Sequence, residues 1–448
     1  AQARSRDRLV SGAVAVVTGQ QAGLFGGPLF TLYKAATAIV DARALEAETG
    51  VPCVPVFWLQ NEDHDHDEIA SCRVLGSDGR VHEVVAPGDP AHARRSIGAR
   101  ALGPAVVPAL DQLERILGAA SEVAEVLAAL RGAYTADQSP DAAFRAWIDQ
   151  WLGPHGLLVL DPRHPDLQAA ARPVHLRAIA LGSGPAEAGA AAVVAGGFTP
   201  QVHVRPGSPL PFVHPDGADG PRYRLAPGPG GWTLVGADRP VDLDTAALSS
   251  SALSRPIVQD HLLPTAAMVC GPGELAYFAQ LPPVYAAFGL PMPAIVPRAR
   301  FRWIDETTSR LLTQLGVGPD QRPEPYAPGA VDPLALERAL LDPFQATLAG
   351  FDPLDDPALA KAIDKTRGTV TEVVGRLVDR VRRTLAARDE VRVDRMARLE
   401  ARLRPGGEPQ ERVHAWLGLA ARVGAHALVD RVLAEVVPWD GALRDLRP

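Results

Sequence analysis

Residues 14–68 read VAVVTGQQAGLFGGPLFTLYKAATAIVDARALEAETGVPCVPVFWLQNEDHDHDE. The stretch begins with apolar and β-branched residues, continues through a glycine-rich loop, and carries apolar residues at helical spacing from about Leu29 to Glu48. A second apolar run, Val51–Leu59, follows, so the pattern predicts a strand, a loop, a helix and a strand. This order is one βαβ unit. We therefore expect both loops after the strands to emerge at the carboxyl edge of a parallel sheet, where open α/β sheets bind ligands.

A run of seven titratable residues, 62–68, follows the second predicted strand. Carboxylates and imidazoles are the groups that acid–base sites and divalent-metal sites use. Glu62, Asp63 and His64 are therefore candidate catalytic residues, and Asp65 is a candidate binding residue. In an extended segment, alternation would bring Asp63 and Asp65 to one side and place His64 on the other. Further metal ligands are not evident, so the metal stays unknown, and a solvated acidic loop is the alternative.

The glycine-rich loop after the first strand could bind an anion or a sugar, because backbone N–H groups can approach a ligand where no Cβ intervenes. The loop matches neither the P-loop pattern nor GxGxxG. Gly27-Pro28-Leu29 with Tyr33 is loosely similar to the nucleotide-binding HIGH segment of class I aminoacyl-tRNA synthetases. Alternatively, the glycines only permit a tight turn. The candidate binding residues of this loop are Gly19, Gln20, Gln21, Gly23 and Gly27.

Lys34 lies in the first turns of the predicted helix and is the only lysine in the first 360 residues. Arginine supplies the other positive charges there, which makes the retained lysine notable. Lys34 could meet a carboxylate or phosphate and offset negative charge that develops during a reaction, so we count it among the catalytic candidates. The alternative is a solvated surface lysine.

A second glycine turn, Gly271-Pro272-Gly273-Glu274, follows the apolar run Ala266–Cys270 and opens a helix predicted to reach about Phe288. In a doubly wound sheet this turn would face the first loop across the switch point of the strand order. Arg298 is a further candidate clamp for a carboxylate or phosphate, because guanidinium binds such groups bidentately. The candidate binding residues of this part of the chain are Arg255, Gln259, Asp260, Gly271, Gly273, Glu274 and Tyr277.

Several of these blocks together resemble the bacillithiol biosynthesis family BshC. They are Val16–Leu24, Gly27–Lys34, Pro55–Trp58 and Glu62–Asp65, and the blocks from Leu253 to Tyr277 extend the resemblance over almost the whole chain. His66 departs from the family, which more often has an aromatic residue there. The resemblance implies an α/β fold: a Rossmann-like doubly wound parallel sheet with connecting-peptide insertions and a C-terminal α-helical coiled-coil arm.

Composition and periodicity predict six segments. They are 1–100, the first half of the Rossmann-like core with a hairpin insertion; 101–155, a helical insertion; 156–196, a continuation of the core; 197–254, a β-rich insertion with a strand at Gln201–Arg205; 255–330, the second half of the core; and 331–448, a coiled-coil arm with C-terminal helices. In the arm, a long helix from Ala358 to Leu403 would pair with a return helix from Glu408 to about Val436. A plain helical hairpin is the alternative to the coiled coil. We expect the arm to form a homodimer.

The composition restricts the partners. A formal net charge of −7 and a pI near 6.0 argue against nucleic acid as a partner. No run of 18 apolar residues is present, so no membrane span is predicted. Three widely spaced cysteines indicate neither a disulfide framework nor a zinc site and favour the cytoplasm. The chain begins at Ala1 rather than Met, and the resembled family carries a further N-terminal segment, so we expect residues upstream.

The resemblance implies a cysteine ligase that adds cysteine to the amino group of glucosaminyl-malate and so forms an amide bond. A free carboxylate must be activated before it forms an amide, so we expect ATP or another nucleotide as a cofactor, with a divalent metal as an option. Two other functions stay open. One is a nucleotidyltransferase of the class I synthetase-like type, and the other is a non-catalytic, dimeric assembly protein of the pathway. A related thiol built on a different sugar acid also fits.

Overall fold

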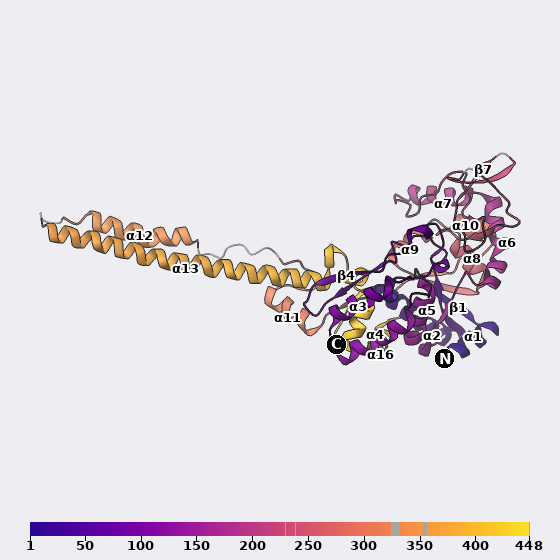
Figure 1. The fold of residues 1–448 in the computed structure, drawn as a ribbon, viewed down its shortest axis with the longest axis horizontal. Helices are drawn as coiled ribbons and strands as arrows, with labels where there is room; N and C mark the ends of the chain where they lie inside the picture. Colours follow the sequence, from indigo (N-terminus) through magenta and orange to yellow (C-terminus); the bar gives the residue numbers. More distant parts are fainter. Residues whose placement is uncertain (229, 238, 324–331, 353–355, 448) are drawn as a thin grey trace. The chain divides into compact units, whose positions relative to one another are not determined.

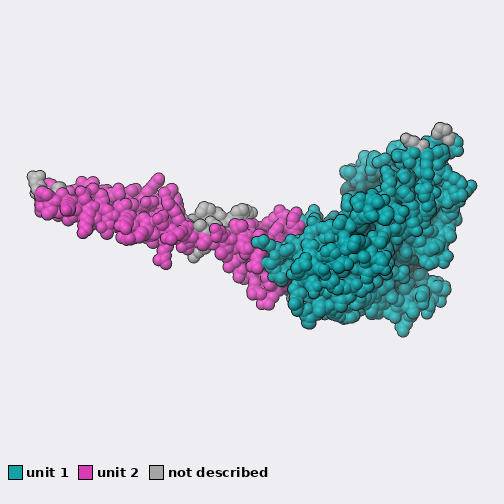
Figure 2. Space-filling view, viewed as in Figure 1, with its two compact units in different colours: residues 1–303, 408–447 teal, residues 304–407, 448 magenta. Residues whose placement is uncertain are grey.

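The computed structural model describes residues 1–228, 230–237, 239–323, 332–352 and 356–447, and Figure 1 shows its fold. Contacts divide the chain into two compact units, which Figure 2 colours separately. Unit 1 comprises residues 1–303 and 408–447, and unit 2 comprises residues 304–407. The sequence placed the start of the helical arm at residue 331, a boundary that lies outside the described residues.

Unit 1 is built around a five-stranded sheet in which every neighbouring pair is parallel. The strands are β1 (Val14–Gln20), β2 (Cys53–Leu59), β5 (Leu158–Leu160), β11 (Thr265–Cys270) and β12 (Ala294–Pro297). Their order across the sheet is β12-β11-β1-β2-β5, so the chain runs outward from β1 in one direction and then returns to run outward in the other. This order confirms the predicted doubly wound, Rossmann-like fold, and it places the switch point between β1 and β11.

Helices cover both faces of the sheet. Along β2, Val54, Val56 and Trp58 join one apolar cluster, while Phe57 and Leu59 join another. The cluster that contains Phe57 and Leu59 packs with α2 (Leu29–Thr49), α5 (Pro140–Leu152), α15 (Trp416–Val423) and α16 (Ala425–Glu435). The cluster that contains Val54, Val56 and Trp58 packs with α6 (Pro165–Leu181), α8 (Arg255–Leu262), α9 (Pro272–Phe278) and α10 (Pro282–Phe288). Burial on both faces explains why β2 reads as a continuous apolar run rather than an alternating one.

Smaller elements complete unit 1. The remaining helices are α1 (Gln2–Val10), α3 (Val106–Leu117), α4 (Ser121–Ala133), α7 (Gly184–Ala195) and α14 (Gln410–Val413). The remaining strands are the hairpin β3 (Ser71–Leu75) with β4 (Val81–Val85), the pair β6 (Phe212–His214) and β10 (Ala247–Ser249), the sheet of β7 (Leu225–Gly228), β8 (Gly231–Leu234) and β9 (Pro240–Val241), and the pair β13 (Arg300–Trp303) and β14 (Leu443–Leu446). The hairpin lies where the sequence predicted it.

Two local predictions are wrong, each for an identifiable reason. The predicted strand Gln201–Arg205 does not form, because the backbone N–H and C=O of Val202 both pair with the side-chain amide of Gln280, at 2.9 Å each. The predicted helix from the second glycine turn to Phe288 is broken into α9 and α10. Pro282 begins α10, where a missing N–H costs nothing.

Unit 2 is helical. Its helices are α11 (Glu306–Leu315), α12 (Pro333–Ala349) and α13 (Pro357–Leu403). Both α11 and α12 pack against α13, and Figure 1 shows α12 lying along it. Leu311 and Leu315 of α11 share an apolar cluster with Leu399 and Leu403.

The predicted return helix of the arm is wrong. Residues 408–447 belong to unit 1 and form α14, α15 and α16 instead of one helix. Trp416 and Leu428 from this segment are buried in the unit 1 core, and Gly424, with φ of 86°, separates α15 from α16. The apolar stripe of this segment is therefore used by the core of unit 1, and α12 takes the place beside α13.

Among the described residues, no single helix has the length and apolar character needed to cross a membrane. The helices α6 and α7 reach that length and apolar character only when taken together, and the pair is bent by 70°.

Gly26, in the first glycine-rich loop, provides a test of the packing. Its φ is 90°, and a Cβ there would lie 2.3 Å from Nε1 of the buried Trp147 and 2.8 Å from Nε1 of the buried Trp416. Gly26→Ala should lower the free energy of unfolding by about 2–5 kcal/mol, from backbone strain and overpacking together. Gly12→Ala is the matched control, because Gly12 has φ of 96° and open space around it, so about 1–2 kcal/mol is expected. Equal losses in urea unfolding would contradict this packing.

Candidate functional site

A cavity of about 470 Å³ lies in unit 1 at the carboxyl edge of the sheet, at the switch point between β1 and β11. We call it the main cavity. Its size is typical of a small-molecule site. It is lined by Gln20, Phe30, Lys34, Trp58, Gln60, Glu62, Asp63, Glu68, Gln201, Val202, Arg222, Ser250, Ser251, Ala252, Arg255, Gly271, Pro272, Gly273, Glu274, Tyr277, Arg298 and Arg412. Gln20 at the end of β1, the second glycine turn and the acidic run therefore contribute to one site.

Lys34 joins the two loops of the switch point. It projects from α2, and its Nζ donates to the carbonyl oxygen of Gly19 at 2.8 Å and to Oε1 of Gln20 at 2.9 Å. It also forms an ion pair with Oε2 of Glu274 at 2.5 Å. Lys34 is buried, with 3% of its surface exposed, so it is not a solvated surface lysine. An ammonium group has three N–H donors, and all three are used here.

Burial lowers the pKa of Lys34, and the carboxylate of Glu274 acts in the opposite direction without cancelling this shift. The same carboxylate oxygen accepts a hydrogen bond from the backbone N–H of Gly271 at 2.9 Å, which fixes the start of α9. The lysine thus holds the second glycine turn against the end of β1.

The acidic run after β2 is held through its backbone. Three backbone carbonyl oxygens of the run accept hydrogen bonds. The oxygen of Glu62 accepts from the hydroxyl of Ser96 at 3.0 Å, and that of Asp63 accepts from the N–H of Ile97 at 2.7 Å. The oxygen of His64 accepts from the guanidinium of Arg100 at 2.9 Å. The segment is not a strand, so the predicted alternation of Asp63 and Asp65 against His64 is wrong. Instead, Nδ1 of His64 lies 3.3 Å from Oδ1 of Asp63.

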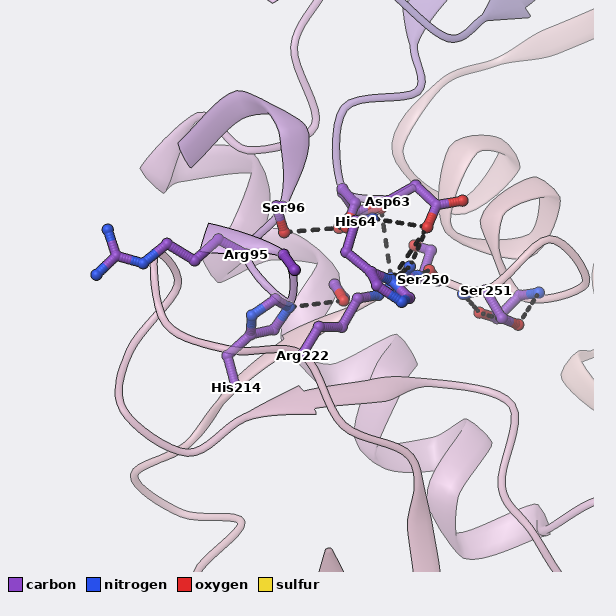
Figure 3. A network of polar contacts seen from close by, with 12 residues as sticks. Asp63, His64, Arg95, Ser96, His214, Arg222, Ser250 and Ser251 are labelled. Carbon is purple, nitrogen blue, oxygen red and sulfur yellow. Dashed lines mark hydrogen bonds and ion pairs between the residues drawn. The ribbon is translucent and has the colours of Figure 1, made fainter. Parts of the chain in front are cut away.

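Arg222, from the β-rich insertion, is the partner of this acidic run (Figure 3). It is buried, donates to Oδ1 of Asp63 at 2.8 Å and to the carbonyl oxygen of Ser250 at 2.5 Å, and its guanidinium lies 3.7 Å from the centre of the Phe212 ring. Burial acts to raise the pKa of Asp63. The hydrogen bond from His64 and the charge of Arg222 outweigh burial and hold that pKa well below its usual range. Asp63 is therefore an ionised structural partner of Arg222.

Glu62 lies beside this pair but in a different environment. Its Oε2 accepts from the backbone N–H of Ser250 at 3.3 Å. Burial raises its pKa to about 7, and the charge of Arg222 and the hydrogen bonds with Ser250 only partly oppose that shift. Two neighbouring carboxyl groups thus have pKa values far apart, the arrangement by which an enzyme separates a proton acceptor from a fixed charge.

His214 positions the strand end that carries Ser250. Its Nε2 lies 2.9 Å from the hydroxyl of Ser249, and its Nδ1 lies 3.1 Å from the carbonyl oxygen of Gly220. Burial lowers the pKa of His214 to about 4, so the ring is neutral near pH 7 and can both donate and accept. Figure 3 shows His214 to the left of Arg222, on the side away from Ser251.

The structure divides the candidate residues into two groups. Those that line the main cavity are Gln20, Lys34, Glu62, Asp63, Arg255, Gly271, Gly273, Glu274, Tyr277 and Arg298. Those that do not are Gly19, Gln21, Gly23, Gly27, His64, Asp65, Gln259 and Asp260. Asp260 is turned toward the hydroxyl of Tyr285, with which it forms a short hydrogen bond, and Gln259 lies between Asp260 and Arg255.

The glycine loop after β1 does not surround the main cavity, because it packs against distant helices. The N–H of Gly26 donates to the hydroxyl of Tyr134 at 2.9 Å, and Nε1 of Trp416 donates to the carbonyl oxygen of Gly26 at 3.0 Å. Gly23 and Gly27 line a separate, smaller cavity of about 190 Å³. Close packing explains why glycine is needed at position 26 without any ligand.

No group of three or more His, Cys, Asp or Glu residues in the described part of the chain is arranged to hold a metal ion. No step of the chemistry below uses a metal ion.

Sequence reasoning missed several lining residues. Arg222 lies in a Gly- and Pro-rich insertion with no motif around it, and Arg412 lies in a segment read as part of the arm. The run Ser249-Ser250-Ser251, directly before the block at Leu253, was a signal that could have been used.

Two family models match the chain. "Bacillithiol biosynthesis BshC, N-terminal Rossmann-like domain" matches residues 3–299, and "Bacillithiol biosynthesis BshC, C-terminal coiled-coil domain" matches residues 342–442. The chain belongs to the BshC family. The resemblance seen in the sequence is thereby confirmed. The second match extends over residues 408–442, which pack in unit 1 in this structure.

Relatives named "Putative cysteine ligase BshC" cover most of the chain. The protein of Heliobacterium modesticaldum is 33% identical over 95% of this chain and 82% of its own. Those of Salinibacter ruber and Thermus thermophilus are 32% and 31% identical, over 89% and 98% of this chain and 77% and 88% of their own. A solved arginyl-tRNA synthetase of T. thermophilus matches 98% of this chain and 85% of its own at 13% identity, with a TM-score of 0.26, too low to carry an argument.

Lys34→Met tests the connection between the two loops. The substitution removes the cation from Glu274, whose side chain is only 13% exposed, so the free energy of unfolding should fall by about 3–5 kcal/mol. Glu274→Gln in the same background should recover part of that loss. Arg131→Met is the control, because its ion pairs with Asp111 and Glu114 are exposed and about 0–1 kcal/mol is expected. A Lys34→Met loss in urea unfolding no larger than the control would contradict the role given to Lys34.

Proposed function

We propose that this chain joins the carboxyl group of cysteine to the amino group of glucosaminyl-malate, forming an amide in the main cavity. Membership of the BshC family and the name of its relatives support the reaction class. The observation that carries the mechanism is Glu62, a carboxyl group on the cavity wall with a pKa of about 7.

Glu62 is the proton acceptor in this proposal. An amine that attacks an acyl carbon must lose a proton, and a base works best when its pKa is near the working pH. Asp63 is the weaker base of the two, because Arg222 and His64 stabilise its ionised form. Its task is to hold Arg222, which in turn holds the strand end at Ser250 and so the hydrogen bond to Glu62.

Arg255 is the proposed ligand for the carboxylates of glucosaminyl-malate. It is buried, and its terminal nitrogens donate to Oε1 of Gln259 at 2.9 Å and to the hydroxyl of Tyr277 at 2.6 Å. Guanidinium has five N–H donors, so these two bonds leave others for a carboxylate. Gln259 and Tyr277 hold the guanidinium group in one orientation, which favours bidentate binding of a carboxylate.

A nucleoside triphosphate is the proposed co-substrate, and the second glycine turn is the part of the cavity that fits it. Nε of Arg298 has no partner among the described residues, and it lies 3.6 Å from the point that a Cβ on Gly271 would occupy. Arg298, Gly271 and Gly273 would hold the phosphates. The nucleotide would activate the cysteine carboxylate, so that one of its oxygens leaves on a phosphoryl or nucleotidyl group while the C–N bond forms and the proton of the amine passes to Glu62.

Glu62→Gln tests this mechanism. The variant should lose about 10²- to 10⁴-fold in kcat, the usual contribution of a general base. Glu62 accepts a proton only when ionised, so kcat/KM of the wild type should fall as the pH drops below about 7, and the variant should lack that limb. Glu125→Gln, at an exposed glutamate on α4, is the control.

The assay follows product mass and nucleotide consumption in the presence of cysteine and glucosaminyl-malate. An unchanged acidic limb in Glu62→Gln would refute the role of Glu62. Pyrophosphate release that needs no cysteine would instead support a nucleotidyltransferase.

We also propose that unit 2 forms the homodimer. Val373, Leu377 and Val391 of α13 lie at heptad spacing and are about half exposed, at 50%, 47% and 48%. Val373→Lys with Leu377→Lys should convert a dimer to a monomer in light scattering, whereas Val107→Lys, at an equally exposed residue of α3, should not. A dimer that survives the double substitution would contradict this interface.

A further inference from the structure

The smaller cavity of about 190 Å³ shares two wall residues with the main cavity. Glu68 and Arg412 line both. The two cavities are therefore neighbours within unit 1, and a ligand group bound by either residue lies where they meet.

The walls of the smaller cavity suit a small ligand. Gly23 and Gly27 approach each other so closely that a Cβ on Gly23 would lie 3.0 Å from Cα of Gly27, so this wall is bare backbone. Small or compact side chains form much of the remainder, namely Pro28, Cys72, Val413 and Ala415. Such a space admits a short side chain and excludes a long one.

Glu68 and Arg412 are the charged groups of the shared wall that the protein leaves available. In the described part of the chain, the carboxylate of Glu68 has no ion-pair or hydrogen-bond partner, and the guanidinium of Arg412 has only an exposed contact with Glu408 at 3.5 Å. The other cations of the main cavity each have a partner in the protein: Lys34 with Glu274, Arg222 with Asp63, Arg255 with Tyr277, and Arg298 with Glu411. The donors that Arg255 and Arg298 leave free are those proposed above for the malate carboxylates and the phosphates.

We propose that the smaller cavity is the subsite for the amino-acid substrate, a small zwitterion whose ammonium group is bound by Glu68 and whose carboxylate is bound by Arg412. This assignment rests on the proposed ligase function and adds to it the place and the partners of the amino acid. The short side chain occupies the space between the glycine loop and Ala415. The carboxylate lies at the shared wall, so its carbon faces the main cavity, where the attacking amine and Glu62 are.

The test is a titration of the full chain with three thiols, in reducing buffer with glucosaminyl-malate and ATP present. The thiols are cysteine, cysteamine, which lacks the carboxylate, and 3-mercaptopropionate, which lacks the amine. Arg412→Gln should weaken cysteine about 10- to 100-fold and leave cysteamine unchanged, because a charged hydrogen bond is lost only where the ligand has a carboxylate. Glu68→Gln should weaken cysteine similarly and leave 3-mercaptopropionate unchanged. Arg145→Gln, an exposed arginine of α5, is the control.

Cysteine affinity that neither variant changes, while the wild type still forms the amide, would overturn the subsite and leave the proposed function standing. Equal weakening of all three thiols by each variant would also overturn it, since that pattern indicates a general loss of structure. A wild-type chain that neither binds cysteine nor forms the product would overturn both proposals.

Discussion

One buried ammonium group holds the site together. Lys34 donates to the end of β1 and is paired with Glu274 at the start of α9, so a single side chain spans the switch point of the strand order. Removing it would take a donor from the Gly19 carbonyl and the Gln20 amide oxygen and would leave the Glu274 carboxylate without its counter-charge, which is costly in a site this little exposed. The separation of the two loops, and hence the shape of the main cavity, follows from this constraint.

A second ion pair fixes the end of β2, and here the carboxylate belongs to the sheet edge and the cation comes from another segment. Arg222 is brought by the β-rich insertion to the end of β2, where it stabilises the ionised form of Asp63 and fixes Ser250. The neighbouring Glu62 is left with burial as its main influence, and its pKa rises to about 7. The ion pair of Arg222 with Asp63 thus separates the pKa values of two adjacent carboxyl groups, and the insertion contributes residues to the main cavity.

Local patterns in the sequence predicted the core but not its long-range contacts. The βαβ unit of residues 14–59 could be read because burial imposes a periodicity on each element. The glycine at position 26 could not be interpreted, since the residues that require it, Trp147 and Trp416, are far along the chain. For the same reason the sequence marks Lys34 as unusual without showing that it contacts Glu274, and it contains no motif that points to Arg222.

In our proposal, Glu62 is the proton acceptor of an amide-forming site. A carbon-13 NMR titration of the side-chain carboxyl groups, with Glu62→Gln used to assign the resonance, measures the decisive property without any substrate. We expect a midpoint of about 7 for Glu62. A midpoint near 4.5, the ordinary value for glutamate, would contradict it.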